Sequence, residues 1–90
     1  MQYEWDKRKD ISNERKHGVS FAEAATVFGD PLAVTFSDPD HSLEEYRYIT
    51  FGLSRWGRHL VVAHAELTNR TRIISARPMT HQERNVYEED

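Results

Sequence analysis

Two arginines lie at the ends of a β-forming run near the C-terminus, the segment Arg72-Ile73-Ile74-Ser75-Ala76-Arg77. The apolar centre of this run is expected to be buried, and an arginine in such a setting normally requires an anionic partner or ligand. Because a guanidinium group matches phosphate oxygens in pairs, both arginines are candidate catalytic cations. The alternative is that each pairs with a carboxylate such as Glu66 or Glu88. Residues five apart point to opposite faces of an unbulged strand, so we expect the two arginines to have different tasks unless a bulge intervenes.

His64 and Glu66 lie two positions apart in another β-forming run and are predicted to point to the same side of their strand. Histidine suits proton transfer near neutral pH, and the glutamate could orient its ring or act as the base itself. The alternative is a core histidine bonded to a carbonyl. Tyr87 is a further catalytic candidate, because its ring could stack on a base or its hydroxyl could transfer a proton. A tyrosine that anchors a helix is the alternative.

The chain carries 12 Lys and Arg residues against 15 Asp and Glu residues, a formal net charge of -3. This charge argues against an indiscriminate nucleic-acid binder, although a localised basic face is still possible. Lys9, Asn13, Lys16 and His17 fall on one face of a predicted helix, and this face is either solvated or functional. We expect Lys9, Lys16, His17 and Arg47 to contact phosphate groups; for His17 the alternative is an interaction with the helix dipole.

Several classes of chemistry are not expected. The chain has no cysteine, its five histidines show no i, i+4 pair, and it has no glycine-rich phosphate loop. We therefore predict no metal and no cofactor. Ninety residues without a signal segment or an apolar run approaching the roughly 18 of a membrane span predict a single domain over 1–90 in the cytoplasm.

Cap and turn signals divide the chain into eight predicted elements. Helices are expected from Asp6, as N-cap, to Gly18, from the capping box of Ser20 and Glu23, and from the capping box of Thr80 and Glu83 to Glu88. Strands are expected at 2–5, 32–37, 45–53, 59–67 and 72–77, with a turn at Asp38-Pro39-Asp40. Short connections between successive strands favour an antiparallel sheet of four to five strands. Two N-terminal helices packed on it and a short C-terminal helix complete an α+β fold.

An ordered set of motifs along nearly the whole chain resembles one family. The motifs are Trp5-Asp6-x-x-Lys9, Asn13-x-x-Lys16-His17-Gly18-Val19-Ser20-Phe21, Glu23-Ala24, Phe28-x-Asp30-Pro31, Glu45-x-Arg47, Gly52-Leu53-Ser54, Val61 to Glu66, Arg72 to Arg77, and Glu83-Arg84-x-x-Tyr87-Glu88. Together they are similar to the BrnT family, RelE-like ribonuclease toxins of bacterial toxin-antitoxin pairs.

The resemblance implies a RelE-like fold and metal-independent cleavage of RNA that inhibits translation. It also implies neutralisation by a BrnA-like antitoxin, contact with operator DNA only through that antitoxin, and a dimer within the complex. No membrane partner is expected. The alternatives are a non-catalytic protein that binds the antitoxin and modulates operon repression, and a plain RNA-binding module. The catalytic residues do not follow from the fold, because one fold supports many sites.

Overall fold

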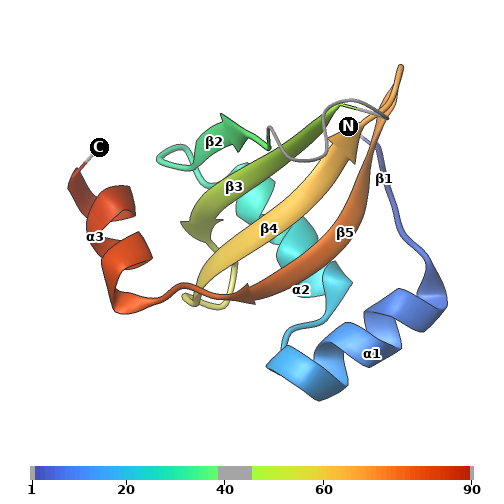
Figure 1. Cartoon of the computed structure of the whole chain (residues 1–90), viewed down its shortest axis with the longest axis horizontal. Helices are drawn as coiled ribbons and strands as arrows, with labels where there is room; N and C mark the ends of the chain where they lie inside the picture. The colour runs from blue at the N-terminus through green and yellow to red at the C-terminus, as the bar shows by residue number, and fades with distance from the viewer. Residues whose placement is uncertain (1, 39–45, 90) are drawn as a thin grey trace.

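The computed structural model describes residues 2–38 and 46–89 and contains three α-helices around one five-stranded sheet (Figure 1). The elements, in chain order, are β1 (Gln2–Glu4), α1 (Lys7–His17), α2 (Phe21–Thr26), the short 3-10 helix η1 (Val27–Gly29), β2 (Val34–Ser37), β3 (Arg47–Leu53), β4 (His59–Glu66), β5 (Arg70–Pro78) and α3 (His81–Glu89). Three features of the sequence lie outside the described residues: the predicted turn at Pro39-Asp40, one histidine, His41, and the predicted start of a strand at Glu45. The α+β expectation is confirmed.

The sheet has the order β1-β5-β4-β3-β2 and is mixed. Strands β2 to β5 form the expected antiparallel meander, whereas β1 pairs with β5 in parallel, in the register Gln2 with Arg70 and Glu4 with Arg72. The expectation of a purely antiparallel sheet is corrected by this edge. After β1 the chain forms α1 and α2 and then adds β2 at the opposite edge of the sheet. The partner of β1, which is β5, is therefore the last strand in the sequence.

A bulge in β5 decides which face each of its side chains occupies. Ala63 pairs with Ser75 and His64 pairs with Ile73, so Ile74 is an extra residue without a counterpart in β4. Arg72 and Arg77 therefore stand opposite Ala65 and Val61, which share one face of β4. From the sequence, Arg72 and Arg77 are expected on opposite faces unless a bulge intervenes. The bulge does intervene, so the two arginines lie on the same face, about four residue steps, or roughly 13 Å, apart.

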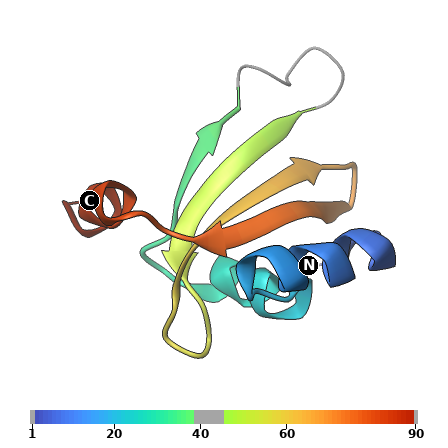
Figure 2. The same cartoon turned by 60° about the horizontal axis from the view of Figure 1, so that its bottom comes forward.

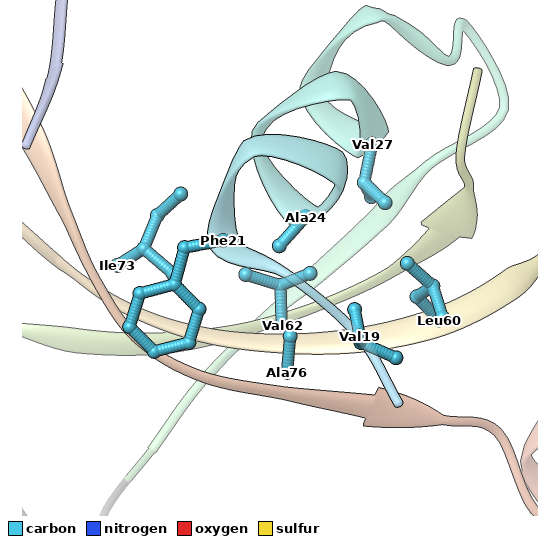
Figure 3. Packing of buried hydrophobic residues seen from close by; sticks show 8 residues of the cluster. All are labelled: Val19, Phe21, Ala24, Val27, Leu60, Val62, Ile73 and Ala76. Carbon is cyan, nitrogen blue, oxygen red and sulfur yellow. The ribbon is translucent and has the colours of Figure 1, made fainter. Parts of the chain in front are cut away.

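The hydrophobic core lies between α2 with η1 and the face of the sheet opposite to Arg72 and Arg77 (Figure 3). The buried residues of this core are Val19, Phe21, Ala24, Val27, Leu60, Val62, Ile73 and Ala76. Figure 2 shows α1 and α2 together on this side of the sheet, with α3 apart from them. We call the sheet side opposite the core the outer face; it carries Arg72, Arg77 and the alternate residues of β3 and β4.

The helix ends follow the local sequence signals closely. Asp6 accepts hydrogen bonds from the backbone N–H groups of Arg8 and Lys9 at the start of α1, and Gly18 ends this helix with φ +72°. Thr80 and Glu83 form a complete, reciprocal capping box. None of the helices in the described ranges is long and apolar enough to cross a membrane.

The other predicted capping box is only half formed. Ser20 accepts a hydrogen bond from the N–H of Glu23, but the carboxylate of Glu23 turns away from the helix end. It accepts hydrogen bonds from the Arg58 guanidinium and from the Ser54 hydroxyl at 2.8 Å. The pair with Arg58 holds the pKa of Glu23 below its usual value. Glu23 thus joins α2 to the β3–β4 turn rather than capping its own helix.

The side chain of Asn13 joins α1 to the exposed edge of β5. Its amide donates to the Ala76 carbonyl at 2.8 Å and accepts from the Ala76 N–H at 3.1 Å, and it also donates to the Val19 carbonyl at 2.9 Å. Asn13 therefore does what a neighbouring strand would do, because β1 pairs with β5 only up to Arg72. It is 8% exposed and is the buried residue of α1.

We predict that Asn13→Ala lowers the free energy of unfolding by about 2–4 kcal/mol, because three buried backbone groups lose their partner. Urea unfolding followed by circular dichroism measures the loss. Ser12→Ala, an exposed neighbour in the same helix, is the control and should change stability by less than about 0.5 kcal/mol. An equally small effect of Asn13→Ala would contradict the role given to this side chain.

Candidate functional site

A groove between α1 and β5 gathers most of the cations of the first helix. It has a volume of about 430 Å³ and is lined by Arg8, Lys9, Ser12, Asn13, Lys16, His17, Ile74 and Ser75. Asn13 fixes the inner side of the helix on β5, so the residues one turn before and one turn after it border the groove. In the parts of the chain that the structure describes, Arg8, Lys9 and Lys16 form no ion pair with a carboxylate. We call this the α1–β5 groove.

The same helix borders a second hollow of about 460 Å³, which Arg8 and Lys16 also line together with Arg15. The positive charge of α1 is therefore spread around its outer side. Three of the four predicted phosphate contacts, Lys9, Lys16 and His17, meet in the α1–β5 groove. Arg8, which the sequence analysis did not single out, joins them, since it precedes Ser12 by one helical turn.

The fourth predicted phosphate contact, Arg47, lies elsewhere. Arg47 and the predicted catalytic Arg72 stand on either side of Ala65 on the outer face, because both pair with it in adjacent strands. Glu4 pairs with Arg72 in the next strand, and the N–H of Asp38 bonds to the Arg47 carbonyl at the far end of the row. Two arginines thus flank Ala65 at this end of the sheet, with an acidic residue beyond each of them.

His64 and Glu66 point to the same side of β4, as expected, and interact directly. The distance from His64 Nδ1 to Glu66 Oε2 is 2.6 Å, and that from His64 Nε2 to the Thr50 hydroxyl is 2.7 Å. Thr71 donates to the Glu66 carboxylate, and the Thr50 hydroxyl lies 2.8 Å from that of Thr35. The result is a continuous chain of polar side chains across four strands, on the core side of the sheet.

His64 is 3% exposed, and this burial lowers its pKa, although the carboxylate of Glu66 opposes the shift. The imidazole is therefore neutral at pH 7, and its Nδ1–H donates to Glu66 while Nε2 accepts from Thr50. Phe28 packs edge-on against the imidazole at 4.8 Å between ring centroids, and Tyr48 stacks on it at 5.9 Å. Beside this network lies a cavity of about 310 Å³, lined by Phe28, Thr35, Tyr48, His64, Glu66 and Thr71. We call it the His64–Glu66 pocket.

Arg77 pairs with a carboxylate that the sequence analysis had not considered. Its guanidinium forms two parallel hydrogen bonds to Glu83, of 2.7 and 2.8 Å, and so ties β5 to the first turn of α3. The hydrogen bond to Arg77 lowers the pKa of Glu83 to about 2, against the opposing effect of burial. Glu66 and Glu88, the partners weighed from the sequence, bond to His64 and Arg84 instead.

Tyr87 anchors α3 to the rest of the molecule. Its hydroxyl donates to Asp30 Oδ2 at 2.6 Å, and its ring packs edge-on against His59. The same Asp30 oxygen accepts the N–H of Leu53. Burial and the neighbouring Asp30 raise the pKa of Tyr87 to about 12, so the phenol keeps its proton at neutral pH. This is the helix-anchoring geometry that was the alternative for Tyr87.

The five predicted catalytic residues therefore lie in different places. His64 and Glu66 are together on the core side, Arg72 and Arg77 are on the outer face, and Tyr87 is in α3. The aromatic walls of the His64–Glu66 pocket, Phe28 and Tyr48, were missed, although Tyr48 shares the strand alternation of Thr50 and could have been found from it. Among the described residues, no group of three or more His, Asp or Glu side chains could hold a metal ion.

The structure is that of a small α+β protein with a cationic groove along its first helix, a surface whose charge attracts anions. The sequence defines the family more narrowly: residues 5–83 match the sequence model described as "Ribonuclease toxin, BrnT, of type II toxin-antitoxin system". The chain belongs to this family. A toxin of a type II system implies an antitoxin partner.

A solved structure supports the fold. The crystal structure of the Brucella abortus ribonuclease toxin BrnT, at 1.1 Å resolution, is similar to this chain with a TM-score of 0.69 and 22% sequence identity. The match covers 90% of this chain and 99% of the other. Comparison with curated protein sequences gave no match.

The Arg77–Glu83 pair predicts a specific dependence of stability on pH. Because its pKa is lower in the folded chain than its ordinary 4.5, Glu83 stabilises the fold above that value and loses this contribution as pH falls towards about 2. Glu83→Gln should therefore lower the melting temperature at pH 7 and flatten its fall between about pH 5 and pH 3. Glu89→Gln, at the exposed end of α3, is the control. If the melting temperatures of wild type and Glu83→Gln instead fall by the same amount over this pH range, the pairing is refuted.

Proposed function

We propose that this chain is a metal-independent endoribonuclease that cleaves RNA bound in the α1–β5 groove and thereby inhibits translation. The observation that supports this proposal best is the groove itself, which Arg8, Lys9, Lys16 and His17 line together. Three cations in one groove suit the phosphates of a single RNA strand. Family membership supplies the ribonuclease class.

Cleavage of RNA without a metal requires a group that removes the 2′-hydroxyl proton, cations that stabilise charge on the phosphorus centre, and an acid for the leaving oxygen. Among the residues that line the groove, His17 is the type best suited to proton transfer near neutral pH. His17 would take the 2′-hydroxyl proton and, once protonated, would give a proton to the leaving 5′-oxygen. Lys16, next to it in the sequence, would stabilise the developing charge on the phosphorus centre. Arg8 and Lys9, about two turns earlier in α1, would hold an adjoining phosphate.

The five residues first considered as catalytic take other positions in this proposal. Arg77 and Tyr87 are held by Glu83 and Asp30, which suits the positioning of α3. Arg72, with Arg47, belongs to the outer face. His64 and Glu66 lie in a separate pocket, whose lining residues include no lysine or arginine.

We place the antitoxin, a BrnA-like protein, on the outer face. Phe36 is 42% exposed there, and Ile49 and Phe51 are half-buried, so the surface combines apolar side chains with the arginines of the neighbouring strands. Occupation of this face would leave operator DNA to the antitoxin. A second toxin copy could join through the same complex. This surface also supports the alternative function, a non-catalytic protein that binds the antitoxin and modulates operon repression.

Purified chain should cleave single-stranded RNA equally well with and without EDTA. Lys16→Ala should reduce the rate about tenfold or more, since one charge-assisted contact to the phosphate is lost. Lys7→Ala is the matched control, because Lys7 is an exposed lysine of the same helix that does not line the groove. Intact RNA after incubation with the wild type would reject the enzyme and leave the antitoxin-binding alternative.

Tyr87→Phe separates anchoring from catalysis. Loss of the hydrogen bond to Asp30 should cost about 0.5–1.5 kcal/mol of unfolding free energy, while the rate of RNA cleavage stays within about twofold of wild type. Tyr46→Phe, at a surface tyrosine, is the control for both measurements. A fall in rate of more than about tenfold without unfolding would instead assign Tyr87 to the chemistry.

A further inference from the structure

The His64–Glu66 pocket is separate from the α1–β5 groove and has a different character. Its lining combines two aromatic rings, two threonines, a neutral imidazole and one carboxylate, and it includes no lysine or arginine. A phosphate has no cation to pair with among these residues and would be repelled by Glu66. The ligand that fits is instead planar, uncharged or cationic, and rich in hydrogen-bond donors.

Glu66 is fixed in position but is not fully used. Its carboxylate receives one hydrogen bond from His64 and one, shared between its two oxygens, from Thr71. An ionised carboxylate has about four lone-pair sites, so roughly half of its accepting capacity is still available. The side chain is 41% exposed, which allows donors of a ligand to reach it.

The polar chain behind Glu66 prevents it from turning away. His64 holds Glu66 through Nδ1, Thr50 holds His64 through Nε2, and Thr35 contacts Thr50. Phe28 and Tyr48 fix the imidazole from two sides. In the described part of the chain, every fully buried side-chain nitrogen and oxygen has a hydrogen-bond partner. The carboxylate is therefore preorganised at the border of an aromatic cavity.

We propose that this pocket binds a guanine base of single-stranded RNA, with Glu66 accepting its N1–H and N2–H groups and the aromatic walls packing on the ring. The inference rests on the proposed ribonuclease function for its biological setting. Among the four RNA bases, guanine alone presents two adjacent donors on its Watson–Crick edge. Adenine and cytosine each place an acceptor beside their donor, and uracil places an acceptor on both sides of its single donor.

The position of the pocket suits a base next to the cleaved bond. Thr71 lines the pocket and Ile74 lines the α1–β5 groove, so the two sites lie along the same strand, three residues or about 10 Å apart. A short single strand could lay its phosphates in the groove and turn one base into the pocket. Glu66 would then determine which sequences are cut, without taking part in the cleavage.

Nucleoside binding tests the pocket independently of cleavage. Guanosine at millimolar concentration should shift the amide NMR signals of Tyr48, His64, Glu66 and Thr71, while adenosine should bind about tenfold or more weakly. Glu66→Gln should remove the guanosine response, because an amide cannot accept both donors. Glu89→Gln should bind guanosine as wild type does. No guanosine response at these residues, or an equal response to adenosine, overturns the proposal.

Free arginine is the competing probe, since its guanidinium also offers paired donors and could represent a side chain of a protein partner. Arginine binding in the pocket without guanosine binding would assign it to a protein ligand and overturn the proposal. Cleavage mapping on mixed-sequence RNA then gives the functional arm. Wild type should show guanine enriched at one fixed position beside the cut. Glu66→Gln should lose that enrichment about tenfold and still cut RNA.

The two arms separate the failures. Guanosine binding by a chain that cuts no RNA would reject the ribonuclease and retain the base pocket. Cleavage with no guanine preference, in a chain that also fails to bind guanosine, would reject the pocket and retain the ribonuclease. Tyr48→Leu should weaken guanosine binding, because the base loses one aromatic ring on which to stack. Tyr48→Phe, which retains the ring, should bind guanosine as wild type does. Thermal melting of each variant verifies that the fold is intact.

Discussion

The two hydrogen bonds between Asn13 and Ala76 are the constraint on which the arrangement of this molecule depends. A sheet edge with unpaired backbone groups must be covered, and β1 is too short to cover all of β5. The Asn13 amide satisfies both backbone groups of Ala76 and also holds the chain at Val19, where α1 turns into α2. One side chain thereby fixes the position of α1, and with it the cationic side of the helix that borders the groove.

The bulge at Ile74 has the next largest effect, because it changes the face of every residue on one side of it. Without the bulge, Arg72 would point into the layer of His64 and Glu66, where its charge would neutralise the carboxylate. With it, Arg72 lies on the outer face beside Ala65, and Ile73 and Ala76 both reach the core. The same irregularity therefore keeps the His64–Glu66 pocket free of lysine and arginine and brings Arg72 to the same surface as Arg77.

Sequence reasoning succeeded where the controlling interactions are local. The caps at Asp6 and Gly18 and the capping box of Thr80 and Glu83 depend on residues a few positions apart. The common side of His64 and Glu66 follows from strand alternation within one segment. Sequence reasoning failed where the partners are distant in the chain. It did not predict the parallel pairing of β1 with β5 or the attachment of Asn13 to Ala76. It also did not predict that Glu23 pairs with Arg58 instead of capping its own helix. No local pattern encodes which of several carboxylates an arginine will meet.

The net charge of -3 is a sum over the whole chain and does not describe any one surface. The pairs of Glu23 with Arg58 and of Glu83 with Arg77 each remove one charge of either sign, so they leave this sum unchanged. The charge is instead distributed unevenly. The helix α1 contains five Lys and Arg residues against Asp10 and Glu14, and in the described chain Arg8, Lys9 and Lys16 form no ion pair with a carboxylate. The electrostatic field that an anion meets depends on the charges close to it, and along α1 their sum is positive.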